Sequence, residues 1–476
     1  GREIQGIPRN RRGDVMSRKF QCKAVPSTWL ESNGRRLDCG PYLSGAMEAR
    51  ELLRRLPAVK EPLSSITMGI YHAGRESRLW VETDEYGVPF MGSTDVLASD
   101  LSSLPLISKK QVRANPNFTI RPGWTLITRS GTIGRMAYAR NDMDGVACSE
   151  HVMRVVPDTS KVKPGYIYAY LSSKFGLPIV LSGTYGSIIQ SIEPHHISDL
   201  PVPRLGEVED QVHELVQQAS DLRTDANELI AAQVKSLEEE IAGGPIIWEH
   251  KKPQSFSIEA RSISSFARRL DAFHHIGFVG EAEKKACVPL IEISAVADAL
   301  RPPIFKRVHV QEGGYEFLGG ADVMTMAQNS DVSISANTKN IDKFIVKPGQ
   351  VLFQCVGQRY GIFGKPTLAN RNLIGKAVSE HQIRIIPHDV KDAGYISIYL
   401  ATGFGLRFLL KNSSGTSIPV LQEDGARKIQ IYWPDQEKRR AISIIAENAW
   451  ENRARAIELE DQARTLVERT IEEGGR

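Results

Sequence analysis

The sequence predicts an α+β protein: two tandem β-rich α/β domains, each followed by a long helix, with the two helices pairing as an antiparallel coiled coil. Segments of the first half recur in the same order in the second, and each half ends in an apolar heptad pattern. A chain of 476 residues also exceeds what one core usually serves. We expect the first domain over residues 1–205, its helix over 206–242, the second domain over 250–433 and its helix over 434–476.

The internal repeat covers most of each half. "SEHVMRVVP" from Ser149 matches "SEHQIRIIP" from Ser379, and "GYIYAYLSSKFG" from Gly165 matches "GYISIYLATGFG" from Gly394. Two upstream pairs are "RPGWTLI" from Arg121 with "KPGQVLF" from Lys347, and "RRLD" from Arg35 with "RRLD" from Arg268. Within the first 55 residues, the repeat rests on the string "RRLD" alone. Collinear matches of this kind indicate duplicated domains.

Each half ends in apolar residues spaced alternately by four and three, the pattern by which helices pair. The two expected seams are also in register with each other, because Ala219 and Ala449 lie 230 residues apart. The first seam comprises Val208, Val212, Leu215, Ala219, Leu222, Ala226 and Leu229. The second comprises Ile442, Ile445, Ala449, Asn452, Ala456, Leu459, Ala463, Leu466 and Thr470. The alanines favour close packing of the two helices against each other.

Composition restricts the class of protein. The 60 Lys and Arg against 56 Asp and Glu give a net charge of +4, which neither requires nor excludes a polyanionic partner. The five cysteines are scattered without a C-x-x-C pair, so we expect reduced thiols in a cytoplasmic protein, with no metal site and no cofactor. No apolar run approaches the ~18 residues that span a bilayer, so no membrane partner is expected.

Several motifs together resemble one known family. "LITRSGTIGRMAYA", "SEHVMRVVP", "GYIYAYLSS", "TYGSIIQSI" and "ISDLPVP" precede a long helix in the order found in target-recognition domains of type I restriction–modification specificity subunits. The second half resembles a divergent copy, with "CVGQRYGIFG" in place of "RSGTIGRMAY" and "SSGTSIPVL" in place of "TYGSIIQSI". The resemblance covers residues 60–241 and, less closely, 285–472.

The resemblance implies a non-catalytic, sequence-specific subunit that reads each half of a split double-stranded DNA site with one domain. It also implies two DNA methyltransferase subunits as partners, and a nuclease–translocase subunit as a further one. Partner-binding positions on the helices would be Leu222, Leu229, Ala449, Ala456, Leu459 and Leu466.

The glycine-rich string "SGTIG" from Ser130 suits either a tight β-turn or a phosphate contact, and it lacks the Lys-Ser/Thr of a nucleotide-binding loop. With the resemblance, DNA contact is the better interpretation, because arginine reads guanine or grips phosphate and hydroxyls suit the backbone. The candidates in this loop are Thr128, Arg129, Ser130, Thr132 and Arg135.

The equivalent loop of the second half has different side chains, so the two halves would read different bases, glutamine favouring adenine. Its candidates are Gln354, Gln358, Arg359 and Tyr360. Two further turns add Tyr185, Ser187, Thr416 and Ser417. "SKKQVR" from Ser108 suits a solvated surface strand as well as phosphate binding.

No string carries a convincing catalytic site. Ser149, Glu150 and His151 are adjacent, and side chains of adjacent strand residues point to opposite faces, so we interpret Glu150 as structural. The histidine pairs at His195 and His274 lack ligand spacing. Two alternatives remain open: a self-contained DNA methyltransferase or nuclease with paired recognition domains, and a coiled-coil scaffold that binds protein.

Overall fold

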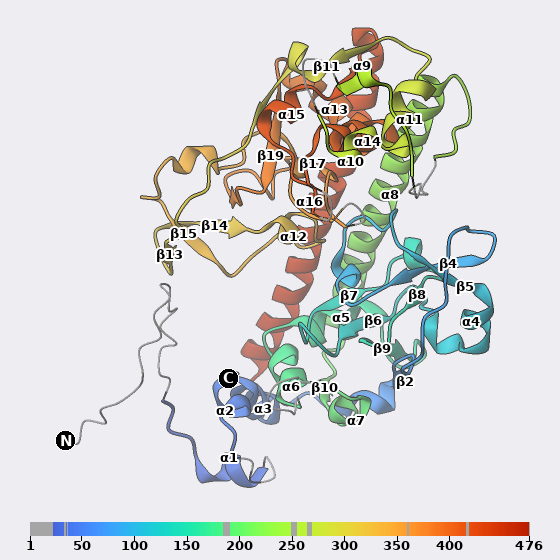
Figure 1. The fold of residues 1–476 in the computed structure, drawn as a ribbon. Helices are drawn as coiled ribbons and strands as arrows, with labels where there is room; N and C mark the ends of the chain where they lie inside the picture. The colour runs from blue at the N-terminus through green and yellow to red at the C-terminus, as the bar shows by residue number, and fades with distance from the viewer. Residues whose placement is uncertain are drawn as a thin grey trace, which may run out of the picture.

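A computed structural model describes residues 22–32, 35, 37–183, 191–248, 255–263, 269–358, 361–415 and 418–475. Two halves, each mixing helices with small sheets, lie on opposite sides of two long helices (Figure 1). The expected mixture of helices and strands is confirmed. The helices are α1 (Ser27–Ser32), α2 (Gly40–Leu43), α3 (Ala46–Arg55), α4 (Lys109–Ala114), α5 (Pro164–Ser172), α6 (Gly176–Ser182), α7 (Pro194–Ile197), α8 (Val208–Ala242), α9 (Ala260–Ile263), α10 (Ala272–His275), α11 (Gly277–Lys285), α12 (Gly320–Val323), α13 (Ala393–Ala401), α14 (Gly403–Asn412), α15 (Glu423–Arg427) and α16 (Gln436–Gly474).

The strands of the two halves follow the same order. The first half has β1 (Lys60–Pro62), β2 (Thr67–Tyr71), β3 (Trp80–Val81), β4 (Gly87–Met91), β5 (Leu106–Ser108), β6 (Thr125–Thr128), β7 (Met136–Tyr138), β8 (Ala147–Cys148), β9 (Val152–Pro157) and β10 (Pro201–Pro203). The second half has β11 (Leu290–Glu292), β12 (Ala297–Leu300), β13 (His309–Val310), β14 (Gly314–Leu318), β15 (Ser333–Ser335), β16 (Val351–Gln354), β17 (Pro366–Leu368), β18 (Ala377–Val378), β19 (Gln382–Pro387) and β20 (Gln430–Tyr432).

Sheet topology repeats as well as strand order. The first half pairs β1 with β10 and forms the sheets β2-β9-β6-β7 and β3-β5-β4-β8. The second half pairs β11 with β20 and forms β12-β19-β16-β17 and β13-β15-β14-β18. A parallel strand pairing within each half's sheets also recurs. It joins β4 to β8, with Phe90 opposite Ala147, and β14 to β18, with Phe317 opposite Ala377. The collinear sequence matches therefore correspond to a duplicated fold.

Helices α5 and α13 join each half to a long helix, α5 against α8 and α13 against α16. Both short helices are almost entirely buried. A Cβ on Gly165 would lie 2.9 Å from the Cα of His213 in α8, and one on Gly394 would lie 2.5 Å from the carbonyl oxygen of Ser443 in α16. Glycine lets the backbones approach this closely, which explains why the repeated string begins with Gly-Tyr.

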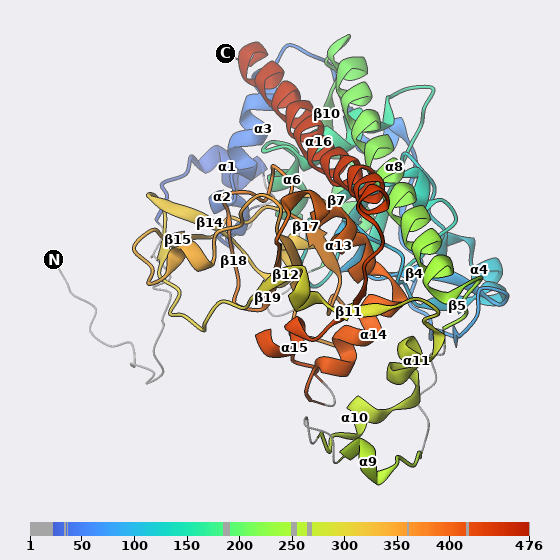
Figure 2. The ribbon, with the colours of Figure 1, turned by 90° about the horizontal axis from the view of Figure 1, so that it is seen from above.

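The long helices α8, of 35 residues, and α16, of 39, pack side by side and run in opposite directions (Figure 2). Val212 and Val216, near the start of α8, share a core with Val467 and Ile471, near the end of α16. In the middle, Ala219, Ala456 and Leu459 pack together with Leu222 at their edge.

The buried stripe differs from the expected heptad seam. It passes through Arg223 and Arg453, where the heptad pattern predicted their neighbours Leu222 and Asn452. The reason is that each long helix is covered on a second side, by α5 or by α13, which widens and rotates the buried face. Leu229, predicted to lie in the seam, is 37% exposed.

Part of the first half packs against the C-terminal end of α16. Helix α3 contacts the last turns of α16, and Figure 1 shows the C-terminus beside it. A Cβ on Gly474 would lie 2.7 Å from a methyl carbon of Leu56. In the second half, α11 packs against α14, and its Val279 shares a core with Ile241 at the end of α8.

Within the described residues, no single helix is long and apolar enough to cross a membrane; a pair bent by 81°, Val390–Ala401 with Gly403–Asn412, passes that test by length and composition. Most of its apolar side chains lie in the core of the second half. The cysteines are free thiols, as expected.

Candidate nucleic-acid interface

The β6–β7 loop of the first half is a tight turn held from inside. The hydroxyl of Thr128 donates to the carbonyl oxygen of Thr132 (2.6 Å) and accepts from the backbone N–H of Arg135 (3.0 Å). Gly131 and Gly134 have φ of 79° and 82°, a region that glycine adopts without strain. Thr128 is 1% exposed, so its hydroxyl holds the turn and is not free to contact DNA.

Arg129 has a different role from the predicted one. Its side chain is 5% exposed, and its guanidinium donates to the carbonyl oxygens of Ile192 (3.0 Å) and Glu150 (3.3 Å) and pairs with the carboxylate of Glu193. A buried arginine bonded in this way fixes the loop to the start of α7 and presents no fork to a groove. The sequence signal was misleading because an arginine beside a glycine turn is usually exposed.

The outer face of the same turn is exposed. Thr132 and Arg135 are exposed, and Ser130 is half-buried, with its hydroxyl hydrogen-bonded to Nδ1 of His151. Of the five candidates in this loop, Thr132 and Arg135 are therefore the ones placed to meet a ligand. They offer a hydroxyl and a positive charge, which suit phosphate oxygens and base edges.

The equivalent loop of the second half is longer. The backbone N–H of Gly364 donates to Gln354 as that of Gly134 donates to Thr128, so residues 355–363 replace residues 129–133. Gln354 is buried, and its side chain bonds to Gln382 (2.8 Å) and to the carbonyl oxygen of Val356 (2.8 Å). Gln354 therefore cannot read a base in this conformation.

Gln358 is exposed at the start of the outer part of this longer loop. The remaining candidates lie outside the described residues: Tyr185, Ser187, Arg359, Tyr360, Thr416 and Ser417. Among the candidates that the structure describes, Gln358 is thus the exposed one in the second half, as Thr132 and Arg135 are in the first.

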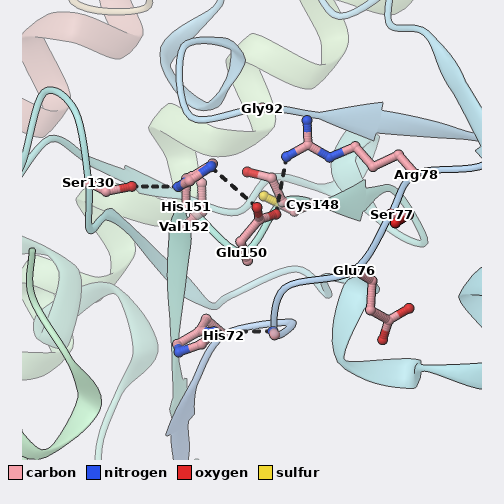
Figure 3. A network of polar contacts seen from close by, with 12 residues as sticks. His72, Glu76, Ser77, Arg78, Gly92, Ser130, Cys148, Glu150, His151 and Val152 are labelled. Carbon is pink, nitrogen blue, oxygen red and sulfur yellow. Dashed lines mark hydrogen bonds and ion pairs between the residues drawn. The ribbon is translucent and has the colours of Figure 1, made fainter.

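Beside the first loop lies a polar network that sequence reasoning assembled only in part (Figure 3). Glu150 pairs with Arg78 (3.1 Å) and with Nε2 of His151 (3.3 Å), and the ring of His151 reaches Ser130. The expectation that Glu150 and His151 point apart is wrong, because they lie in a turn ahead of β9 and not within a strand. Arg78 precedes the short strand β3 and was missed.

The same network recurs in the second half. Arg307 pairs with Glu380 at 3.0 Å, and Nε2 of His381 lies 3.9 Å from the same carboxylate. Each arginine also lies over an aromatic ring 5.0 Å away, Arg78 over Phe90 and Arg307 over Phe317. A match of these arginines at an offset of 229 residues would have found them.

The carboxylates in both networks are held in the charged form. Burial raises the pKa of Glu150, but a backbone hydrogen bond, Arg78 and His151 outweigh it, so that the pKa is lowered overall. The pKa of Glu380 is also raised by burial and is lowered overall by its backbone hydrogen bond, Arg307 and His381. In the second half Val356 stands where the first has Ser130, so the contact of the histidine with a hydroxyl is not repeated. The repeated part is a structural ion pair.

The predicted partner-binding residues divide by burial. Ala449 and Ala456 are 0% exposed and Leu459 is 4% exposed, all within this chain, so they have no surface to offer another protein. Leu222 and Leu466 are partly buried against neighbouring side chains, and Leu229 is exposed. The error has one cause: residues that pair two helices within the chain were also assigned to a partner.

Among the residues that the structure describes, no group of three or more His, Cys, Asp or Glu side chains could hold a metal ion.

No protein-family model matches this chain. No curated protein matches it either. Solved structures do: the chain is similar to S subunits of type I restriction–modification systems. The S subunit from M. genitalium matches 87% of this chain and 94% of its own, with a TM-score of 0.33 and 12% identity. The HsdS subunit from Thermoanaerobacter tengcongensis matches 88% of this chain and 95% of its own, with a TM-score of 0.27 and 14% identity. A chain from a study of the assembly of the type I R-M system matches 87% and 98%, with a TM-score of 0.28 and 15% identity.

Proposed function

We propose that this chain is the DNA sequence-recognition subunit of a type I restriction–modification system and directs a methyltransferase to a bipartite DNA site. The observation that carries the proposal is a duplicated fold with loops that are not duplicated. The sheets repeat strand for strand, whereas residues 129–133 and 355–363 differ in length and in side chains. Two half-sites of different sequence need two readers of one shape with different reading residues.

The exposed loop side chains suit this role. Arg135 would bind phosphate or the guanine edge, Thr132 would bind the backbone, and Gln358 would pair with adenine. Behind them, Arg129 and the ion pairs of Glu150 and Glu380 hold the loops in place. Reading residues on a rigid support lose little entropy on binding.

The rest of the proposal follows the resemblance of the motifs. Residues 1–205 and 250–433 would be target-recognition domains, and 206–242 and 434–476 would form the antiparallel coiled coil between them. Two methyltransferase subunits would dock on this chain, and a nuclease–translocase would join them. The chain itself would carry out no chemistry.

The deciding experiment is methylome sequencing of a host with the gene intact, deleted, and carrying Gln358→Ala. Deletion should abolish methylation of one bipartite motif. The variant should relax the base preference in the half of the motif that the second domain reads. A methylome unchanged by deletion would contradict the proposal. Methyl transfer by the purified chain alone would favour the enzymatic alternative, and the absence of salt-dependent duplex binding would favour the protein scaffold.

A further inference from the structure

The two halves also touch each other directly, beside the middle of the long helices. Residues 97–99 of the first half lie antiparallel to residues 324–326 of the second, with Ala98 opposite Thr325. We call these six residues the loop pair. Both segments follow the same turn, in which a glycine N–H donates to an aspartate three residues on: Gly92 to Asp95 at 2.8 Å and Gly319 to Asp322 at 2.9 Å.

The loop pair is symmetric. Ala98 and Thr325 are equivalent positions in the repeat, since each lies three residues after the aspartate of its turn. The backbone N–H of Ser99 donates to Met324 (3.0 Å), and that of Met326 donates to Leu97 (2.8 Å). Equivalent segments that bond to each other reciprocally mark the local twofold relation between the halves.

Side chains from both halves extend the contact. Met326 is 8% exposed, lies in a core of the first half with Met91 and Val96, and touches the guanidinium of Arg140. Beside it, Lys365 of the second half pairs with Asp100 of the first (3.1 Å). The two halves are therefore joined by apolar, ionic and backbone contacts at one place.

The loop pair is also tied to the middle of the helices. Arg223 of α8 donates to the carbonyl oxygen of Met326 (3.4 Å). Arg453, the equivalent residue of α16, donates to Asn227 (2.6 Å), which in turn bonds to Asp142 of the first half (2.7 Å). Ser99, Arg223, Met326 and Arg453 line a small cavity of about 10 Å³ at this place.

We propose that the loop pair, with Met326 as its central side chain, is a specificity element that fixes the spacing between the two DNA half-sites. This inference rests on the proposed function. Anchoring at the two ends of the helix pair alone, the first half through α3 and α5 and the second through α13, would still leave each half free to tilt about its own anchor. A second attachment between the halves removes that freedom.

The size of one base pair shows why the contact would discriminate. Adding one pair to the spacer moves a half-site by ~3.4 Å along the duplex and turns it by about 35°. Hydrogen bonds of 2.8–3.0 Å do not survive a displacement of that size. A site with the wrong spacer could be read by both domains only after the loop pair had opened.

The test measures binding of the full-length chain, in its complex with the methyltransferase, to duplexes that carry both half-sites with spacers from two pairs short to two pairs long. The variants are Met326→Ala, alone and with Lys365→Met. Met324→Ala is the matched control, because Met324 packs against the core of its own half. We expect the unaltered protein to prefer one spacer by about tenfold or more, the Met326 variants to lose most of that preference, and the control to keep it.

An unchanged preference in the double variant would overturn the inference while leaving the proposed function intact. Failure of the unaltered complex to bind any bipartite duplex would overturn the proposed function itself. If the Met326 variants unfold, a second experiment replaces them. Ala98→Cys and Thr325→Cys are introduced together, with the exposed native cysteines replaced, so that oxidation can link the two segments by a disulfide. Oxidation should leave binding to the preferred spacer unchanged, and loss of that binding would show that the loop pair must open.

Discussion

Arg223 of α8 and Glu460 of α16 form an ion pair at the centre of the helix interface, with one nitrogen–oxygen distance of 3.1 Å and side chains that are 5% and 9% exposed. By the repeat, the position equivalent to Glu460 is Ile230, so Arg453 meets no carboxylate from α8 and bonds to Asn227 instead. The duplicated helices are thus joined by an asymmetric polar layer.

Removing one partner of this pair should be costly. Glu460→Gln leaves Arg223 buried without a counter-charge, and we expect the free energy of unfolding to fall by about 3–5 kcal/mol. The double variant Arg223→Met with Glu460→Leu should recover most of the loss, because matched apolar side chains tolerate burial. Chemical denaturation of the three proteins measures both effects. A double variant no more stable than Glu460→Gln would contradict the assignment.

Substitutions of Arg129 and Arg135, six residues apart, should have different effects on stability and on DNA binding. Arg129→Met removes buried hydrogen bonds, and we expect a loss of about 1–3 kcal/mol in stability. Arg135→Met should leave stability unchanged but flatten the slope of log affinity against log salt by about one unit if Arg135 contacts phosphate. Thermal melts and DNA binding at several salt concentrations separate the two. Equal effects of both variants on stability would contradict the placement of Arg135.

The two loops should act independently. Gln358→Ala should relax recognition of one half-site by about 1–3 kcal/mol if its amide pairs with adenine, and should leave the other half-site unaffected. Thr132→Ala, the matched change in the first loop, should affect only the opposite half. Binding to duplexes permuted in one half at a time measures this. Loss of specificity in both halves from either change would contradict two separate readers.

Asp100 should make the contact between the halves sensitive to acid. Partial burial raises its pKa, but Lys365, hydrogen bonds from Ser102, and Arg453 outweigh it and bring the pKa to about 2. A lowered pKa in the folded state gives stability that is present above about pH 4 and is lost as the pH falls towards 2. The stability difference between the native protein and Asp100→Asn should therefore shrink over that interval in denaturation curves. Asp144→Asn, in an exposed ion pair with Arg121, is the control and should show little difference throughout.

Much of the fold could be predicted because the chain repeats itself. Matches such as "SEHVMRVVP" with "SEHQIRIIP" placed β9 and β19 at equivalent positions, and the apolar spacing placed α8 and α16 within a few residues of their ends. The site was harder to predict, because burial of a charged side chain depends on long-range packing. Arg154 and Arg384 are 0% exposed within strands, and Arg129 and Arg223 are also buried, yet a local reading of the sequence places arginine at a surface.

The contacts between the halves could not be predicted from the sequence repeat. The backbone bonds of the loop pair join residues 227 positions apart and leave no mark in the sequence, and Met326 and Lys365, which add side-chain contacts, belong to no repeated string. The repeat shows that Ala98 and Thr325 are equivalent, but equivalence does not imply contact. That relation became visible only once both halves were placed around the helices.

The core of the first half contains Ala463, Val467 and Ile471 from the end of α16. During synthesis the ribosome adds these residues roughly 260 positions after the first half is otherwise complete, a delay on the order of tens of seconds at ~5–20 residues per second. Throughout that time the nascent first half exposes an apolar face that chaperones would have to shield. A premature stop codon shortly before Ala463 would thus leave the second half largely intact and damage the part of the protein that was translated first.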